Sequence, residues 1–109
     1  MKYFPDVITF VEDGHFAKAA DRLLSGNELF SLMQRLAAEP DLGDIIPQSG
    51  GCRKLRFAAK GKGSRSGVRV IYFHRSSFGQ ILLLDIYAKN EKANLSSSEL
   101  KVLKQKVKS

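Results

Sequence analysis

The sequence contains few of the residues that build covalent or metal-bound frameworks. Cys52 is the single cysteine among 109 residues, and tryptophan is absent. One cysteine cannot form an internal disulfide, nor can it support a cysteine-based metal site. A hydrophobic core therefore has to hold the fold, and we expect neither a metal nor a cofactor.

Long hydrophobic runs are also missing. A run such as Ile81 to Leu84 is far shorter than the roughly 20 apolar residues that cross a membrane. The N-terminal stretch carries one lysine and a few apolar residues that Pro5 and Asp6 interrupt, which is too weak a pattern for a signal peptide. These absences predict a cytoplasmic protein without a membrane partner.

The length and the composition are typical of one globular domain. A chain of 109 residues can bury roughly two thirds of the surface that its unfolded form exposes. The hydrophobic fraction of 43% and the charged fraction of 27% are those of an ordinary folded protein. We therefore predict a single domain over residues 1–109.

Acidic residues are missing from the middle of the chain. No carboxylate lies between Asp44 and Asp85. Residues 1–48 include four basic and eight acidic residues, whereas residues 49–109 include fourteen basic and three acidic ones. The excess, +7 over the whole chain at pH 7, lowers stability by self-repulsion, and a polyanionic partner is its simplest explanation. The charge pattern favours nucleic acid over a merely soluble basic protein.

Three segments have the periodicity and the caps of helices. Apolar residues recur at helical spacing over 16–24, behind Asp13 as N-cap. A serine followed three residues later by a glutamate forms a capping box, and this pattern starts the second and third helices at 25–28 and 96–99. Pro40 ends the second helix.

Strand-like segments lie at 7–11, 53–58, 68–73 and 81–87, and a loop is expected over 41–51. The last three strands follow one another through short connections, which favours an antiparallel meander. The resulting order, β-α-α-β-β-β-α, predicts an α+β fold in which a small antiparallel sheet carries the helices on one face.

A basic surface is expected on the other face. Alternation along residues 53–58 places two apolar side chains on one side and Lys54 and Arg56 on the other. Arg69 in the next strand and Tyr87 in the last strand can join them. Such a surface would bind a phosphodiester backbone by charge and offer Tyr87 as a stacking platform.

Other residues are candidates for contacts around this surface. Tyr72 and Phe73 are alternative stacking residues, and His74 is a weaker acid–base candidate. Affinity for RNA or for the ribosome is expected from Arg53, Lys60, Lys62 and Arg65.

The second half of the sequence also resembles a known family. GDIIPQSGGCRKLRFAAKGKGSRSGVRVIYFHR, followed by ILLLDIYAKNEKANLSSSE, strongly resembles RelE-superfamily toxins of bacterial toxin–antitoxin modules, the HigB-like branch most closely. Four features carry the resemblance: the G-G-x-R-K-x-R strand, the G-K-G loop, the S-G-x-R-V-I-Y-F strand and the L-L-x-x-Y-x-K-x-E-K segment. They span about residues 42–104, and the first forty residues add no signature.

The resemblance implies a RelE-like fold and a ribosome-dependent endoribonuclease that cuts translated mRNA. It also implies a cognate, HigA-like antitoxin with a helix-turn-helix domain, so that operator DNA is contacted only through the complex. Related toxins use residues that correspond here to Lys54, Arg56, Arg69, Tyr87 and Lys89. Some employ a C-terminal His or Tyr, and neither residue type follows Tyr87 here.

The chemistry of RNA cleavage suits these residue types. RNA carries its own nucleophile, the 2′-hydroxyl group, so positioning replaces much of the catalytic machinery. Arg56 and Arg69 can stabilise the phosphorane through bidentate contacts. Neighbouring cations lower the pKa of a phenol or an ammonium group, so Tyr87 and Lys54 are both candidates for the general base. A non-catalytic RNA- or DNA-binding module that uses the same face is the alternative.

Overall fold

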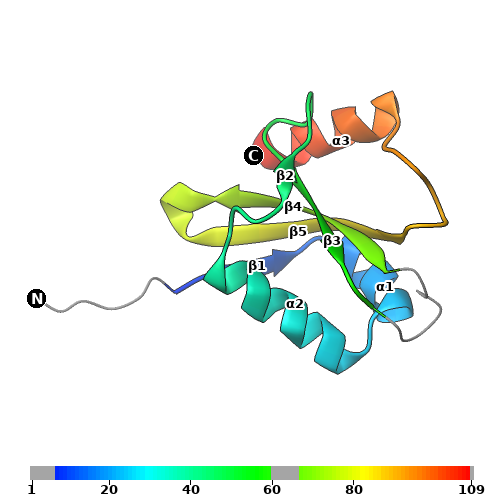
Figure 1. Ribbon diagram of the computed structural model, residues 1–109. Coiled ribbons are helices and arrows are strands. Elements are labelled where there is room, and N and C mark those ends of the chain that lie inside the picture. The colour runs from blue at the N-terminus through cyan, green and yellow to red at the C-terminus, as the bar shows by residue number, and fades with distance from the viewer. Residues whose placement is uncertain (1–6, 60–66, 109) are drawn as a thin grey trace, which may run out of the picture.

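The computed structural model describes residues 7–59 and 67–108. Over these ranges the chain forms an α+β fold in which three α-helices pack on one sheet (Figure 1). The elements in chain order are β1 (Thr9–Glu12), α1 (Gly14–Leu23), α2 (Gly26–Ala38), β2 (Asp44–Ile45), β3 (Arg53–Phe57), β4 (Val68–Arg75), the 3₁₀ turn η1 (Ser76–Phe78), β5 (Gln80–Ala88) and α3 (Ser97–Lys108).

The five strands form one sheet in the order β1-β5-β4-β3-β2. The meander β3-β4-β5 is antiparallel, as the short connections predict. Two features differ from the sequence-based expectation. β1 pairs with β5 in parallel, because α1 and α2 separate β1 from the meander and no hairpin sets its direction. The two-residue strand β2 lies within the predicted loop, since so short a segment has no periodicity to detect.

The first two helices begin at the caps that the sequence indicates. The carboxylate of Asp13 accepts a hydrogen bond of 3.0 Å from the backbone of His15 at the start of α1. Ser25 and Glu28 form a reciprocal capping box at the start of α2, with hydrogen bonds of 2.9 and 3.1 Å. Such caps satisfy backbone N–H groups that the first helical turn leaves without partners.

Helices α1 and α2 cover one face of the sheet and form the larger core. Phe16 and Leu23 of α1 and Leu32 of α2 are at most 2% exposed. They pack with sheet residues that point to the same side, namely Leu55, Phe57, Val68, Val70, Tyr72, Ile81, Leu83, Ile86 and Ala88. The amphipathic stripes of the two helices therefore select this face.

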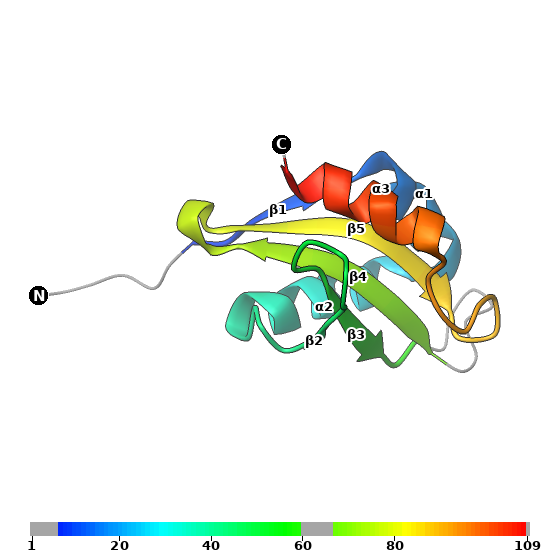
Figure 2. The ribbon, with the colours of Figure 1, turned by 90° about the horizontal axis from the view of Figure 1, so that it is seen from above.

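Helix α3 covers part of the opposite face, so the expectation that all helices share one face is wrong. Leu103 and Val107 of α3 pack with Ile71, Leu84 and Tyr87 in a second core. The two layers of helices lie on either side of the sheet in Figure 1, and Figure 2 looks onto α3 where it lies over β5. The central strands carry apolar side chains on both faces, so the second face also needs a cover.

Polar contacts attach α3 to the rest of the chain. The ammonium group of Lys106 lies 2.9 Å from the carboxylate of Asp13, at the N-terminus of α1. The guanidinium group of Arg75 donates a 3.3 Å hydrogen bond to the carbonyl of Val107 in the last turn of α3. Of the helices in the described ranges, none has the length and apolar character to cross a membrane.

Candidate functional site

Arg56, Arg69 and Tyr87 form one row across the three central strands. Arg56 is the direct ladder partner of Arg69, and Arg69 is the direct partner of Tyr87. Directly opposed residues in an antiparallel ladder point to the same face, with Cβ atoms about 5 Å apart. Three of the residues that the sequence singles out are therefore neighbours on the α3 side of the sheet.

A β-bulge brings Tyr87 into this row. Near the β4–β5 turn, Arg75 pairs with Gln80, and an unbroken ladder would then place Ile86 opposite Arg69. The register shifts by one residue beside Ile71, so that Tyr87 becomes the partner of Arg69. A bulge of this kind redirects the side chains that follow it.

Lys54 belongs to the next row on the same face. It pairs with Ile71, which in turn pairs with Asp85. Lys54 and Arg56 are two residues apart on β3, which separates them by about 7 Å along the strand. The structure thus brings Lys54, Arg56 and Arg69 together over β3 and β4. Arg56 is exposed, and Lys54 and Arg69 are half-buried.

Tyr87 is buried, unlike the three cations. Its side chain is 3% exposed, and its hydroxyl group has no hydrogen-bond partner within the described part of the chain. Burial raises the pKa of Tyr87, although the positive charges of Lys92 and Arg69 act in the opposite direction. The expectation that neighbouring cations lower the pKa of Tyr87 is therefore wrong, because desolvation of the phenolate outweighs their attraction.

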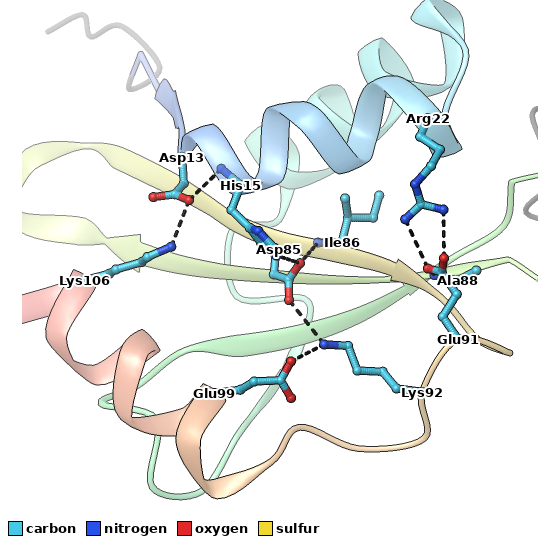
Figure 3. Close-up of polar contacts among 10 residues, drawn as sticks. All are labelled: Asp13, His15, Arg22, Asp85, Ile86, Ala88, Glu91, Lys92, Glu99 and Lys106. Carbon is cyan, nitrogen blue, oxygen red and sulfur yellow. Dashed lines mark hydrogen bonds and ion pairs between the residues drawn. The ribbon is translucent and has the colours of Figure 1, made fainter.

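Lys92, Asp85 and Glu99 form a polar cluster where β5 leads into α3 (Figure 3). The ammonium group of Lys92 lies 4.9 Å from the centre of the Tyr87 ring. The same group donates a hydrogen bond to Glu99 and lies 3.9 Å from the carboxylate of Asp85. Asp85 also accepts a 2.8 Å hydrogen bond from the backbone of Ile86. Tyr87 is thus enclosed by an ion-paired lysine rather than open to solvent.

Two residues of this cluster stand out in the sequence, but their spacing does not predict that they meet. Asp85 is the one carboxylate inside an otherwise apolar strand, and Lys92 is the last residue of the Y-x-K-x-E-K motif. Their contact depends on the bulge in β5 and on the docking of α3. The sequence therefore predicts that Lys92 is solvated, whereas in the structure its ammonium group contacts the ring of Tyr87.

A cavity of about 290 Å³ lies beside the cluster, between α1, β5 and α3. Leu84 and Leu103 form part of its apolar lining, and His15, Asp85 and Glu99 supply polar groups. The imidazole of His15 lies 3.1 Å from the carboxylate of Asp85. Within residues 7–59 and 67–108, no three His, Cys, Asp or Glu side chains gather in a way that could hold a metal ion.

Arg53 lies on the face opposite Lys54 and Arg56. Its ladder partner is Tyr72, whose side chain belongs to the core under α1 and α2. The guanidinium group of Arg53 donates hydrogen bonds of 3.1 and 2.7 Å to the carbonyls of Asp41 and Gly43. The structure therefore gives Arg53 a role in fixing the loop before β2. This position is away from the cationic face, the side of the sheet that carries Lys54, Arg56 and Arg69.

Tyr72 and His74 belong to the same loop attachment. The hydroxyl group of Tyr72 accepts a 2.8 Å hydrogen bond from the backbone of Gly43, and its side chain is fully buried. His74 contacts the carboxylate of Asp41 at 2.8 Å. That hydrogen bond is the main reason why the pKa of Asp41 is lowered. Tyr72 is therefore not available as a stacking platform.

The remaining candidates lie at the margin of the face. Lys89 is exposed directly after β5, and its backbone N–H donates a 3.3 Å hydrogen bond to the carbonyl of Gly67. Lys60, Lys62 and Arg65 fall outside the described residues.

The fold is that of RelE. No protein-family model matches the chain. The structure is similar to that of the E. coli toxin RelE in the free state, a variant in which two arginines are replaced by alanine. The TM-score is 0.58, and the identity is 13% over 92% of this chain and 96% of that chain. It is also similar to a chain of the intact E. coli RelBE toxin–antitoxin complex, with a TM-score of 0.56 and 14% identity over 73% of this chain and 94% of that chain. At such identities the likeness establishes a shared RelE-like fold.

Proposed function

We propose that this chain is the toxin of a toxin–antitoxin pair and that it cleaves RNA on the face formed by β3, β4 and β5. The observation that carries the proposal is the convergence of Lys54, Arg56 and Arg69 on that face. The RelE-like fold supports it, since one of the similar structures is a toxin–antitoxin complex. A surface with three adjacent cations is suited to a phosphodiester.

The proposed reaction uses the 2′-hydroxyl group of the RNA as nucleophile. A general base takes the proton of this hydroxyl, its oxygen attacks the adjacent phosphorus, and the 5′-oxygen of the next nucleotide leaves and takes up a proton. Arg56 and Arg69 hold the non-bridging oxygens, whose negative charge grows in the transition state. Lys54 is the base candidate that lies beside them in the free protein, whereas Tyr87 can serve only after its hydroxyl group becomes accessible.

Three finer assignments rest on the sequence motifs. We assign the chain to the HigB-like branch, with a HigA-like, helix-turn-helix antitoxin as its partner and with operator DNA bound only by the complex. The substrate is mRNA on the ribosome in the cytoplasm, where the basic half of the chain meets rRNA. Lys89 and the basic residues of segment 60–66 would add affinity for that RNA.

The test is primer extension on mRNA incubated with the protein, with and without ribosomes. We expect cuts only in the presence of ribosomes, and their loss in Arg69→Ala. Cuts of equal strength in both reactions would indicate a free ribonuclease. Co-expression with the protein encoded by the neighbouring reading frame should relieve growth arrest if that protein is the antitoxin.

A non-catalytic RNA-binding module is the second candidate. The hydroxyl group of Tyr87 is buried and has no hydrogen-bond partner among the described residues. This favours the binding module, because one of the two candidate bases is inaccessible in the free protein. Under this alternative the protein binds RNA through Lys54, Arg56 and Arg69 but produces no cuts in either reaction.

A further inference from the structure

Lys92 is a cation at the end of the Arg56–Arg69–Tyr87 row. Carboxylates of the protein itself, those of Glu99 and Asp85, neutralise its charge. The ammonium group of Lys92 lies over the ring of Tyr87. The same group is bound by Glu99 and lies 3.9 Å from the carboxylate of Asp85 (Figure 3). The charges of Arg69 and Lys92 both act on the hydroxyl group of Tyr87. Lys92 therefore adds a cation at the β5 end of the row that runs from Arg56 on β3 through Arg69 on β4.

The carboxylate partners of Lys92 come from a part of the chain that has few acidic residues. Residues 49–109 include only three carboxylates, Asp85, Glu91 and Glu99. Two of the three face Lys92, while Glu91 pairs with Arg22 of α1 at 2.8 Å. Two of the few acidic groups of the basic half thus lie against the cation that covers the ring of Tyr87.

The ion pair is also accessible. The side chains of Lys92 and Glu99 are 29% and 38% exposed. Exchange of one oxyanion partner for another at a solvent-accessible pair is energetically cheap, because such pairs contribute little to stability. A phosphate oxygen presents the same charge and the same acceptor geometry to an ammonium group as a carboxylate does.

We propose that Lys92 is a further RNA-phosphate ligand of the cationic face, which Glu99 and Asp85 occupy in the free protein and release when RNA binds. The inference rests on the proposed function, because it names a ligand of the same RNA site. Movement of Lys92 towards a phosphate also removes the cation that covers the ring of Tyr87.

Glu99 permits a clean substitution. One carboxylate oxygen accepts a 2.8 Å hydrogen bond from the backbone of Ser96 and completes the cap of α3, while the other binds Lys92. Glutamine serves the capping box as well as glutamate does. Glu99→Gln therefore keeps the helix start and removes the charge that holds Lys92. Glu12→Gln, on the edge strand β1, makes the same change in net charge at a distance and is the matched control.

The experiment measures binding of a fluorescently labelled single-stranded RNA oligonucleotide by anisotropy over a series of salt concentrations. We expect Glu99→Gln to bind about three- to tenfold more tightly than Glu12→Gln, with a salt dependence steeper by about 0.7 in slope, the value for one added phosphate contact. Lys92→Ala should weaken binding, and Lys92→Ala with Glu99→Gln should lose the gain. Equal affinities of Glu99→Gln and Glu12→Gln would overturn the assignment, as would retention of the gain in the double variant.

The outcomes separate this inference from the proposed function. In one outcome the unmodified protein binds RNA and loses this binding in Arg69→Ala, while Lys92→Ala and Glu99→Gln leave the affinity unchanged. That result rejects only the role of Lys92. Absence of RNA binding in all variants, together with absence of cuts in mRNA on ribosomes, rejects both. Circular dichroism of each variant checks that α3 remains folded.

Discussion

Arg56 on β3 lies directly opposite Arg69 on β4 in the antiparallel ladder. Like charges in this position destabilise a sheet by about 0.2–1 kcal/mol. The Arg56–Arg69 pair lies in the central meander despite this repulsion. Such a pair is expected if its function is to bind a polyanion rather than to stabilise the sheet. Stability and RNA cleavage should therefore respond in opposite directions to its removal.

The first prediction concerns Arg56. Arg56→Gln should raise the free energy of unfolding by up to about 1 kcal/mol, because it relieves the repulsion with Arg69. Cleavage of mRNA on ribosomes should fall at least about tenfold, because a transition-state contact is lost. Chemical denaturation and primer extension measure the two effects. Arg35→Gln, on the exposed side of α2, makes the same charge change and should leave cleavage intact. A loss of both stability and cleavage in Arg56→Gln would indicate a structural role.

The second prediction compares two buried tyrosines. The hydroxyl group of Tyr72 accepts a hydrogen bond from Gly43, whereas that of Tyr87 has no partner in the described part of the chain. Tyr72→Phe should lower the free energy of unfolding by about 1–2 kcal/mol, because the Gly43 amide is left unpaired. Tyr87→Phe should leave it unchanged or raise it by up to about 1 kcal/mol. Equal destabilisation by the two changes, measured by urea unfolding, would contradict this.

The third prediction concerns the hydroxyl group of Tyr87 in cleavage. If this group transfers a proton after Lys92 moves, Tyr87→Phe should slow cleavage by at least about tenfold, while RNA affinity stays within about twofold. Single-turnover cleavage and anisotropy separate the two effects. Cleavage by Tyr87→Phe at the unmodified rate would confine Tyr87 to the core and leave Lys54 as the base.

The fourth prediction tests how Asp13 joins α1 to α3. Asp13→Asn keeps an acceptor for the backbone of His15 and loses the ion pair with Lys106, so it should lower the free energy of unfolding by less than about 1 kcal/mol. Asp13→Ala also loses the cap, which should cost about 1 kcal/mol more. Thermal unfolding of both variants measures the difference. Identical melting temperatures would show that the cap contributes nothing.

The fifth prediction concerns acid stability. Hydrogen bonds from Arg22 and Lys92 lower the pKa of Glu91 and of Glu99, respectively. For Asp13, burial acts to raise the pKa, but Lys106 and the His15 backbone lower it overall. Each group binds a proton more weakly in the folded chain than in the unfolded chain. Its stabilising effect is present above the ordinary values, 4.5 for Glu and 3.8 for Asp, and is lost as the pH falls through the lowered ones.

Melting temperatures should therefore change little with these carboxylates above about pH 5 and fall below about pH 4.5. Glu99→Gln should show a shallower decline than Glu12→Gln, because its contribution no longer depends on protonation. A decline of equal steepness in both variants would mean that the Lys92–Glu99 pair adds no stability to the folded state.

Much of the fold followed from local sequence. The caps at Asp13 and at Ser25, the serine–glutamate start of α3 and the alternation that puts Lys54 and Arg56 on one face are confirmed. These features depend on residues within one turn or one strand, where spacing and hydrogen-bonding chemistry act directly.

The features that were missed involve segments far apart in the chain. The parallel pairing of β1 with β5 and the position of α3 on the second face depend on how apolar surfaces are shared among all elements. Arg53 carries the same charge as its neighbour Lys54, yet it points to the opposite face and fixes a loop. Charge alone does not distinguish a binding residue from a structural one.

By itself, the sequence determined the three helices, the four longer strands, the helix caps and the excess of positive charge in the second half of the chain, because each is a property of neighbouring residues. Only the tertiary structure decided that Tyr87 lies opposite Arg69, that its hydroxyl group is buried, and that Asp85 and Glu99 bind the lysine above it. A one-residue bulge and the docking of a distant helix set these relationships, and the free energy that selects them comes from packing between segments rather than from any local pattern.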